Sequence, residues 1–170
     1  MKKKTRRKIF IFISSIVLIG AVAAGIYFFL NQTKGPTVSV YFFKGSRLVP
    51  VQRAISADEA PLNKALREML KGPDLKEAGQ GIASEIPVGT KLLWIKTGGK
   101  LAVLNFNDKL EFYGGGAAKI QGIIAQIVYT ATSIKGINKV WIRVNGKKEV
   151  VLGGEGLVLD RPLSRRDIRY

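Results

Sequence analysis

A charge-free apolar run near the N-terminus places the strongest constraint on how this chain can be organised. The first eight residues, MKKKTRRK, carry six positive charges, and residues 9–30 then contain no charged side chain. A helix of about 22 residues rises roughly 33 Å, which is enough to cross the hydrocarbon core of a bilayer. The pattern therefore predicts a transmembrane helix over residues 9–30, with residues 1–8 as a basic cytoplasmic tail and residues 31–36 as a linker.

The apolar run could be a signal peptide that is cleaved or an anchor that is retained. The Ala-Val-Ala triplet at residues 21–23 resembles a signal-peptide cleavage site, but apolar residues continue to Leu30, which favours a retained signal anchor. Six basic residues precede the run and only Lys34 follows it closely, so the positive-inside rule predicts a cytoplasmic N-terminus. We therefore expect a single-pass protein of the cell membrane whose C-terminal domain is extracytoplasmic.

The chain contains neither cysteine nor histidine. This composition excludes disulfides, a thiol nucleophile, a Ser-His-Asp triad and the lipid-bearing cysteine of a lipoprotein. It also excludes ordinary transition-metal sites apart from those built of carboxylates alone. We expect no cofactor and no metal site.

The formal charge is positive well beyond the N-terminal tail. Of 28 Lys and Arg residues, seven precede residue 36, which leaves 21 basic residues against 12 acidic ones in the rest of the chain. Such a domain attracts polyanions, and outside a cell these are anionic lipid, wall polymers and acidic proteins. Because we expect export, we do not expect a nucleic-acid partner.

Strand and helix patterns alternate along the remaining chain. Alternating apolar residues with β-branched and aromatic content predict pairs of strands, while apolar residues at steps of three and four predict two helices. The order predicts an α+β fold in which two helices pack on one face of a mixed or antiparallel sheet. One domain would occupy residues 37–166 and a short tail residues 167–170. The strand patterns lie at 37–43, 45–55, 91–97, 101–106 and 137–144, and the helical ones at 59–72 and 117–134.

Three consecutive glycines, residues 114–116, stand directly before the second helical pattern. A glycine-rich loop at a helix start can cradle phosphate, but the phosphate-loop motif requires a lysine followed by a hydroxyl residue. Here Lys119 is followed by Ile120. The pattern favours a flexible joint between a strand and a helix.

Paired carboxylates would be the remaining route to hydrolytic chemistry. The 12 acidic residues stand mostly in turns or beside Lys and Arg on polar helix faces, as solvated surface charge does. Asp108 and Glu111 are close to the glycines, yet nothing in the sequence marks them as buried. We expect no catalytic residues and no enzymatic activity.

Two groups of residues are candidates for contact with a partner or polyanion. Trp141 and Arg143 alternate with apolar residues on one strand, so both point to the same side. Together with Trp94 and Tyr41, Trp141 could form an aromatic sugar-binding platform, although cross-strand packing is the more common use of such rings. The C-terminal arginines could dock on anionic lipid or a partner protein, or belong to a solvated end: Arg161, Arg165, Arg166 and Arg169.

An ordered set of stretches resembles the GerMN domain, a family of bacterial envelope modules named from a sporulation and germination protein. The resemblance covers roughly residues 40–167. The matching pieces are VYFF, LVPVQRAI, ALREMLKGP, GIASEIPVGTKL, LAVLNFNDKL, IQGIIAQIVYTATSIKGINKVWIRVNGK and RPLSRRD.

The resemblance implies a non-enzymatic domain outside the membrane, with a fold similar to ring-building motifs and no established catalytic residues. It implies self-association or a protein partner, and a scaffolding role in sporulation or germination. The alternative reading of the same residues is a binding module for wall glycan or anionic polymer. This chain departs from some members in having room for one such domain and no lipoprotein cysteine.

Overall fold

The structure is a computed structural model that describes residues 18–25, 35–111, 116–152 and 157–168. The chain divides into two compact units, Met1–Lys34 and Gly35–Tyr170. Every residue of the buried apolar cluster belongs to the second unit, so that unit contains its own hydrophobic core.

The N-terminal unit corrects one prediction. Its described part, residues 18–25, is helical and exposed. Within the described ranges, no helix is both long enough and apolar enough to cross a membrane. The predictions of a transmembrane helix over residues 9–30 and of a single-pass location with a cytoplasmic N-terminus are therefore wrong. Residues 9–17 and 26–30 of that segment lie outside the described residues.

The first sheet has the order β2-β1-β3. Strands β1 (Thr37–Lys44) and β2 (Arg47–Ala54) form an antiparallel hairpin, and β3 (Ile82–Ala83) pairs with the end of β1. The alternating apolar residues of β1 are buried: Val38, Val40 and Phe42. Pro50, which lacks an amide donor, lies in the edge strand β2, where a proline is tolerated.

The second sheet has the order β4-β5-β6 and is mixed. Strands β4 (Leu92–Gly98) and β5 (Leu101–Phe106) are antiparallel, whereas β5 and β6 (Lys139–Val144) are parallel. A parallel neighbour requires a long crossover connection, and the connection between β5 and β6 contains a helix. A separate antiparallel pair, β7 (Val150–Leu152) and β8 (Leu157–Leu159), follows.

The two main helices are α2 (Pro61–Lys71) and α4 (Ala117–Ala131), and a short helix, α3 (Leu75–Gly79), follows α2. Helix α2 begins with a proline at its first position and ends at Gly72, whose φ of 82° is readily adopted only by glycine. Helix α4 follows Gly116, which is extended; Gly114 and Gly115, the rest of the expected joint, lie outside the described residues. Two 3₁₀ turns complete the elements, η1 (Asp108–Leu110) and η2 (Arg165–Asp167).

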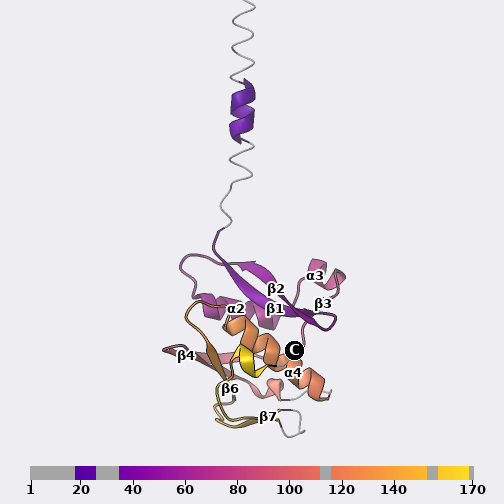
Figure 1. Cartoon of the computed structure of the whole chain (residues 1–170), viewed down its shortest axis with the longest axis vertical. Helices are drawn as coiled ribbons and strands as arrows, with labels where there is room; N and C mark the ends of the chain where they lie inside the picture. The colour runs from indigo at the N-terminus through magenta and orange to yellow at the C-terminus, as the bar shows by residue number, and fades with distance from the viewer. Residues whose placement is uncertain (1–17, 26–34, 112–115, 153–156, 169–170) are drawn as a thin grey trace, which may run out of the picture. The chain divides into compact units, whose positions relative to one another are not determined.

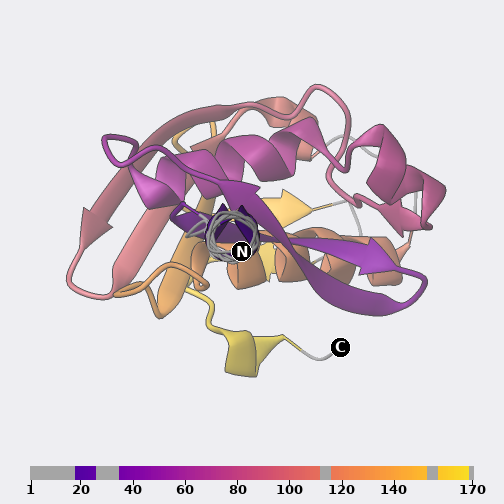
Figure 2. The same cartoon turned by 90° about the horizontal axis from the view of Figure 1, so that it is seen from above.

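Helices α2 and α4 lie between the two three-stranded sheets (Figures 1 and 2). Helix α2 contacts β1 and β4, and α4 contacts β1 and β6. The α+β class agrees with the sequence, but the expected single sheet with both helices on one face is replaced by a layer of strands on each side. The reason lies in α4, which is buried almost all round its circumference and so needs cover on more than one side.

A cluster of ion pairs links β2 to helices α2 and α3. Arg53 donates from both terminal nitrogens to the two carboxylate oxygens of Glu77, at 2.6 Å each, and its Nε lies 3.7 Å from Glu68. The Glu77 carboxylate also accepts from the Asp74 amide in the capping box of α3. The hydrogen bond from Arg53 is the largest influence on Glu77 and, despite partial burial, holds its pKa below the ordinary value of 4.5.

This pair predicts an acid-sensitive part of the stability. Because the folded-state pKa of Glu77 is lowered, its contribution is complete above about pH 4.5 and is lost as the pH falls through the lowered pKa. Glu77→Gln keeps an acceptor for the α3 cap but removes the charge. We expect it to reduce the free energy of unfolding by about 1–2 kcal/mol at pH 7 and by much less at pH 2. Urea denaturation at both pH values measures this, and an equal loss at both would contradict the assignment.

Candidate partner-binding face

One face of the sheet β4-β5-β6 points away from the helices. In β6 the buried side chains Val140, Ile142 and Val144 face the core, so the alternate residues point outward. The pairing register places the outward residues of β5 and β4 beside them. We call these residues the outer face: Trp94, Lys96, Leu101, Val103, Asn105, Lys139, Trp141 and Arg143.

The register places aromatic and cationic side chains in a diagonal pattern on the outer face. Val103 lies between Lys96 and Trp141, and Asn105 lies between Trp94 and Arg143. Each edge strand of the sheet thus carries one tryptophan and, two residues along, one cation.

Each cation stacks on the tryptophan of its own strand. The Arg143 guanidinium carbon lies 4.5 Å from the centre of the Trp141 ring, and the Lys96 ammonium lies 5.2 Å from the centre of the Trp94 ring. Such stacks are stabilising because the face of an indole is electron-rich. Since the chain has only two tryptophans, the outer face holds both of them.

Two donors on the outer face lack acceptors. Trp141 Nε1 and Arg143 Nε are both shielded from solvent, and neither has a hydrogen-bond partner in the described structure. Asn105, by contrast, is buried and its side-chain oxygen accepts from the Gly146 amide at 2.7 Å. A shielded donor without an acceptor costs stability, so these two nitrogens are suited to an acceptor that another molecule supplies.

The surroundings of the outer face are cationic. Residues 86–107 and 135–148, which contain the three strands, hold eight Lys or Arg residues and no acidic residue. The acids in and just before α2 and α3 are already engaged: Glu59, Glu68 and Glu77 form ion pairs with basic neighbours. Three of the eight cations, Lys96, Lys139 and Arg143, lie on the outer face itself.

Arg165, one of the C-terminal candidates, is used inside the domain. Its Nε donates to Thr132 Oγ1 at 2.8 Å, and its Nη2 donates to the Tyr129 carbonyl at 3.1 Å in the last turn of α4. Its guanidinium also stacks on Tyr129 and Tyr41, at 4.8 and 5.4 Å from the ring centres. These contacts tie the C-terminal segment to the end of α4.

The other C-terminal arginines lie closer to solvent. Arg161 is exposed and lies 3.1 Å from Asp167. The Ser164 hydroxyl and amide both donate to Asp167 and, with Arg161, lower the pKa of that carboxyl to about 2. Arg166 is exposed, and Arg169 lies outside the described residues.

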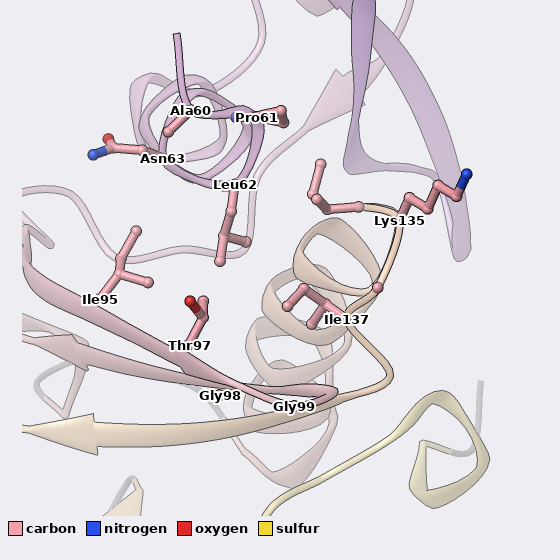
Figure 3. A pocket seen from close by; sticks show the side chains of 12 residues that line it. Ala60, Pro61, Leu62, Asn63, Ile95, Thr97, Gly98, Gly99, Lys135 and Ile137 are labelled. Atoms are coloured by element: carbon pink, nitrogen blue, oxygen red, sulfur yellow. The ribbon is translucent and has the colours of Figure 1, made fainter.

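Two grooves flank the second sheet. The first, of about 550 Å³, lies between the start of α2 and the β4–β5 hairpin. Leu62, Ile95 and Ile137 point into it, while the Lys135 ammonium points away (Figure 3). The second, of about 510 Å³, is polar and cationic and adjoins the outer face through Lys139; its other lining residues are Thr132, Ile137, Asn138, Ser164, Arg165 and Arg166.

Comparison with known proteins decides the family. Residues 26–150 match the model of the Germane family, whose description is sporulation and spore germination. This chain belongs to the Germane family. The domain is GerMN-like, which confirms the resemblance found in the sequence. A search of curated protein sequences gave no match.

Solved structures agree with the family assignment. The tandem GerMN domains of the sporulation protein GerM from Bacillus subtilis share 25% identity, with a TM-score of 0.63 over 79% of this chain and 47% of that one. This chain thus spans about half the length of the tandem structure. The first GerMN domain of the same protein shares 25% identity, with a TM-score of 0.61 over 78% of this chain and 99% of that one. A putative lipoprotein from Clostridium perfringens, at 23% identity, has the same fold, with a TM-score of 0.57 over 81% and 93% of the two chains.

The Germane fold brings only some of the sequence candidates together. Trp94 and Trp141 share the outer face, but Tyr41 lies on the first sheet with its ring 5.5 Å from that of Tyr129. The three-ring platform, the less favoured interpretation of these residues, therefore does not form, because Tyr41 packs against Tyr129. Glu111 lies 3.9 Å from Lys147 and forms an ion pair with it. Within the described ranges, no group of three or more acidic side chains could hold a metal ion.

Sequence reasoning did not assign Lys96, Lys139 or Val103 to the candidate face. The signal was present in the repeated spacing of Trp94 with Lys96 and of Trp141 with Arg143, each a tryptophan followed by a cation two residues later. Only the parallel pairing of β5 and β6 shows that both pairs lie on one face.

Proposed function

We propose that this member of the Germane family is a non-enzymatic assembly or scaffolding protein that serves sporulation or germination. The observation that carries the proposal is the outer face, which presents both tryptophans of the chain, each beneath a stacked cation. The domain would bind another protein, or a second copy of itself, through this face.

The composition of the outer face supports a protein interface. Trp and Arg are the residues most enriched among those that dominate binding energy, particularly where they are partly desolvated and surrounded by other contacts. Here half-buried Leu101 and Val103 lie on the middle strand, between the two strands that carry the tryptophans, and Lys96 and Lys139 are exposed. This apolar centre with a polar rim is the usual anatomy of a protein–protein interface.

The chemistry of the chain supports a non-enzymatic role. Histidine and cysteine, the commonest general bases and nucleophiles, are absent from the sequence. The pKa values of three carboxyls are lowered: that of Glu77 by Arg53, that of Asp167 by Ser164 and then Arg161, and that of Glu68, against the opposing effect of burial, by Lys71 and Lys64. Carboxylates of this kind are poorly suited to proton transfer near neutral pH.

Binding of wall glycan or an anionic polymer is a second candidate function. The cationic groove beside Lys139 favours it, because that groove adjoins an aromatic surface and is lined by no acidic residue. Retention of the protein on purified wall material, weakened by salt, would support this function, and no retention at low ionic strength would contradict it.

Photo-crosslinking from the centre of the outer face tests the assembly function. A photoreactive amino acid replaces Val103, and the matched control places it at Val88, which is 99% exposed in a loop. We expect protein adducts from position 103 in cells that express the chain, either with a second copy or with another protein, and none from position 88. Equal labelling at the two positions, or no adduct from position 103, would contradict the proposal.

A further inference from the structure

We propose that the partner of the outer face is an acidic segment of another protein, and not a second copy of this chain. The inference rests on the proposed assembly function and adds the chemistry of the partner. It draws on three observations: the charge around the face, its two unsatisfied donors and the spacing of its cations.

Charge favours an acidic partner. Lys96, Lys139 and Arg143 project from the outer face, and the segments that contain them hold no acid. Two copies docked through this face would bring six cations into one interface, and the apposition of like charges opposes such docking. Glu68 and Glu77 of a second copy could not readily compensate, because their own basic neighbours already bind them.

The unsatisfied donors require acceptors. Trp141 Nε1 and Arg143 Nε are shielded and unpartnered, while the nearby Asn105 oxygen is engaged by Gly146. A carboxylate offers about four lone-pair sites and accepts from two donors at once. A shift of the Arg143 side chain would expose both nitrogens to one such group.

The pairing register of β4, β5 and β6 sets the spacing that the acidic groups of the partner need. Lys96 and Arg143 lie on strands separated by β5 and are offset by one register row, so their Cα atoms are roughly 12 Å apart. Between them on β5 lie Val103, paired with Trp141, and Asn105, paired with Trp94; Asn105 is buried and already engaged by Gly146. A matching segment carries two carboxylates roughly 12 Å apart with an apolar side chain between them. This apolar requirement favours a protein segment over a sugar-phosphate polymer.

Tryptophan fluorescence gives a direct test, because both tryptophans of the chain lie on the outer face. The probe is a synthetic peptide that repeats Glu-Ser-Leu-Ser, so that in an extended chain Glu and Leu share one face and successive Glu residues are roughly 13 Å apart. It is added to the full chain at low and high salt. Its control is the same peptide with Gln in place of Glu. We expect the acidic peptide to shift the emission with an affinity that falls as salt rises, and the Gln peptide to bind at least about tenfold more weakly.

Matched charge variants identify the surface. Lys96→Gln with Arg143→Gln removes two charges from the outer face, and Lys44→Gln with Lys76→Gln removes two exposed charges elsewhere. We expect at least about a tenfold loss of peptide affinity in the first variant and less than about twofold in the second. If the first variant does not fold, Lys96→Gln alone, at an exposed position, carries the same test with a smaller loss.

The contrary outcomes are distinct. Equal losses in the two double variants, or no emission change with the acidic peptide, would overturn the inference. So would tighter binding of poly(glycerol phosphate) than of the peptide, or self-association that strengthens with salt. An adduct from position 103 with a protein that lacks acidic segments would overturn the inference while leaving the assembly function in place.

Discussion

Leu66→Ala is expected to lower the free energy of unfolding by about 3–5 kcal/mol. Leu66 is fully buried on α2, in the layer between the two sheets, where it belongs to the apolar core together with Leu62, Ala65 and Met69. Removing three carbon atoms there loses the favourable free energy of their transfer from water to the core. It also leaves a cavity that the strands on both sides cannot close. Urea denaturation of residues 35–170, the unit that contains the whole core, measures the change.

Leu75→Ala is the matched control for this prediction. Leu75 begins the neighbouring helix α3 and is 94% exposed, so the same substitution should change the free energy of unfolding by less than about 0.5 kcal/mol. A loss at Leu66 no larger than that at Leu75 would show that α2 is not packed between two layers.

Arg165→Ala is expected to lower the free energy of unfolding by about 2–3 kcal/mol. The substitution removes two hydrogen bonds, one of them to the Tyr129 carbonyl, and two stacking contacts with tyrosine rings. It also removes a cation from the C-terminal end of α4, where the helix dipole favours positive charge. Arg165→Lys should recover only part of the loss, because an ammonium cannot reproduce the planar, two-directional contact.

The adjacent Arg166 supplies the control. It is exposed, so Arg166→Ala should leave the thermal midpoint of unfolding almost unchanged. If Arg165→Ala and Arg166→Ala had equally small effects on the midpoint, Arg165 would be a free surface residue, and the tie between the C-terminal segment and α4 would be refuted.

Much of the fold could be predicted from local patterns. The hairpin of β1 and β2, the second hairpin of β4 and β5, and both main helices all appear where alternation or helical spacing indicates them. Gly72 and Pro61 mark the ends of α2 because their backbone preferences act locally. The separation of the strands into two sheets could not be predicted, since it depends on which faces of α4 are covered, and a broad apolar stripe leaves that open.

The prediction of a membrane span rested on apolar composition alone. Apolar composition over residues 9–30 satisfies the hydropathy requirement, but a span also needs one continuous helix of sufficient length. Among the described residues, no helix is both long enough and apolar enough to do so. Hydropathy alone measures what a segment could bury.

By itself, the sequence determined the order of strands and helices, the excess of positive charge and the lack of histidine and cysteine chemistry. It also determined that each tryptophan shares a strand face with the cation two residues along, because strand geometry has a period of two. Only the tertiary structure decided that the two tryptophan–cation pairs meet on one sheet face and that Arg165 forms its contacts within the domain. Both outcomes depend on contacts between residues more than 30 positions apart, namely the parallel pairing of β5 with β6 and the docking of the C-terminal segment on α4. No local preference of the chain encodes such contacts, because they form only when the burial of the whole core selects one arrangement.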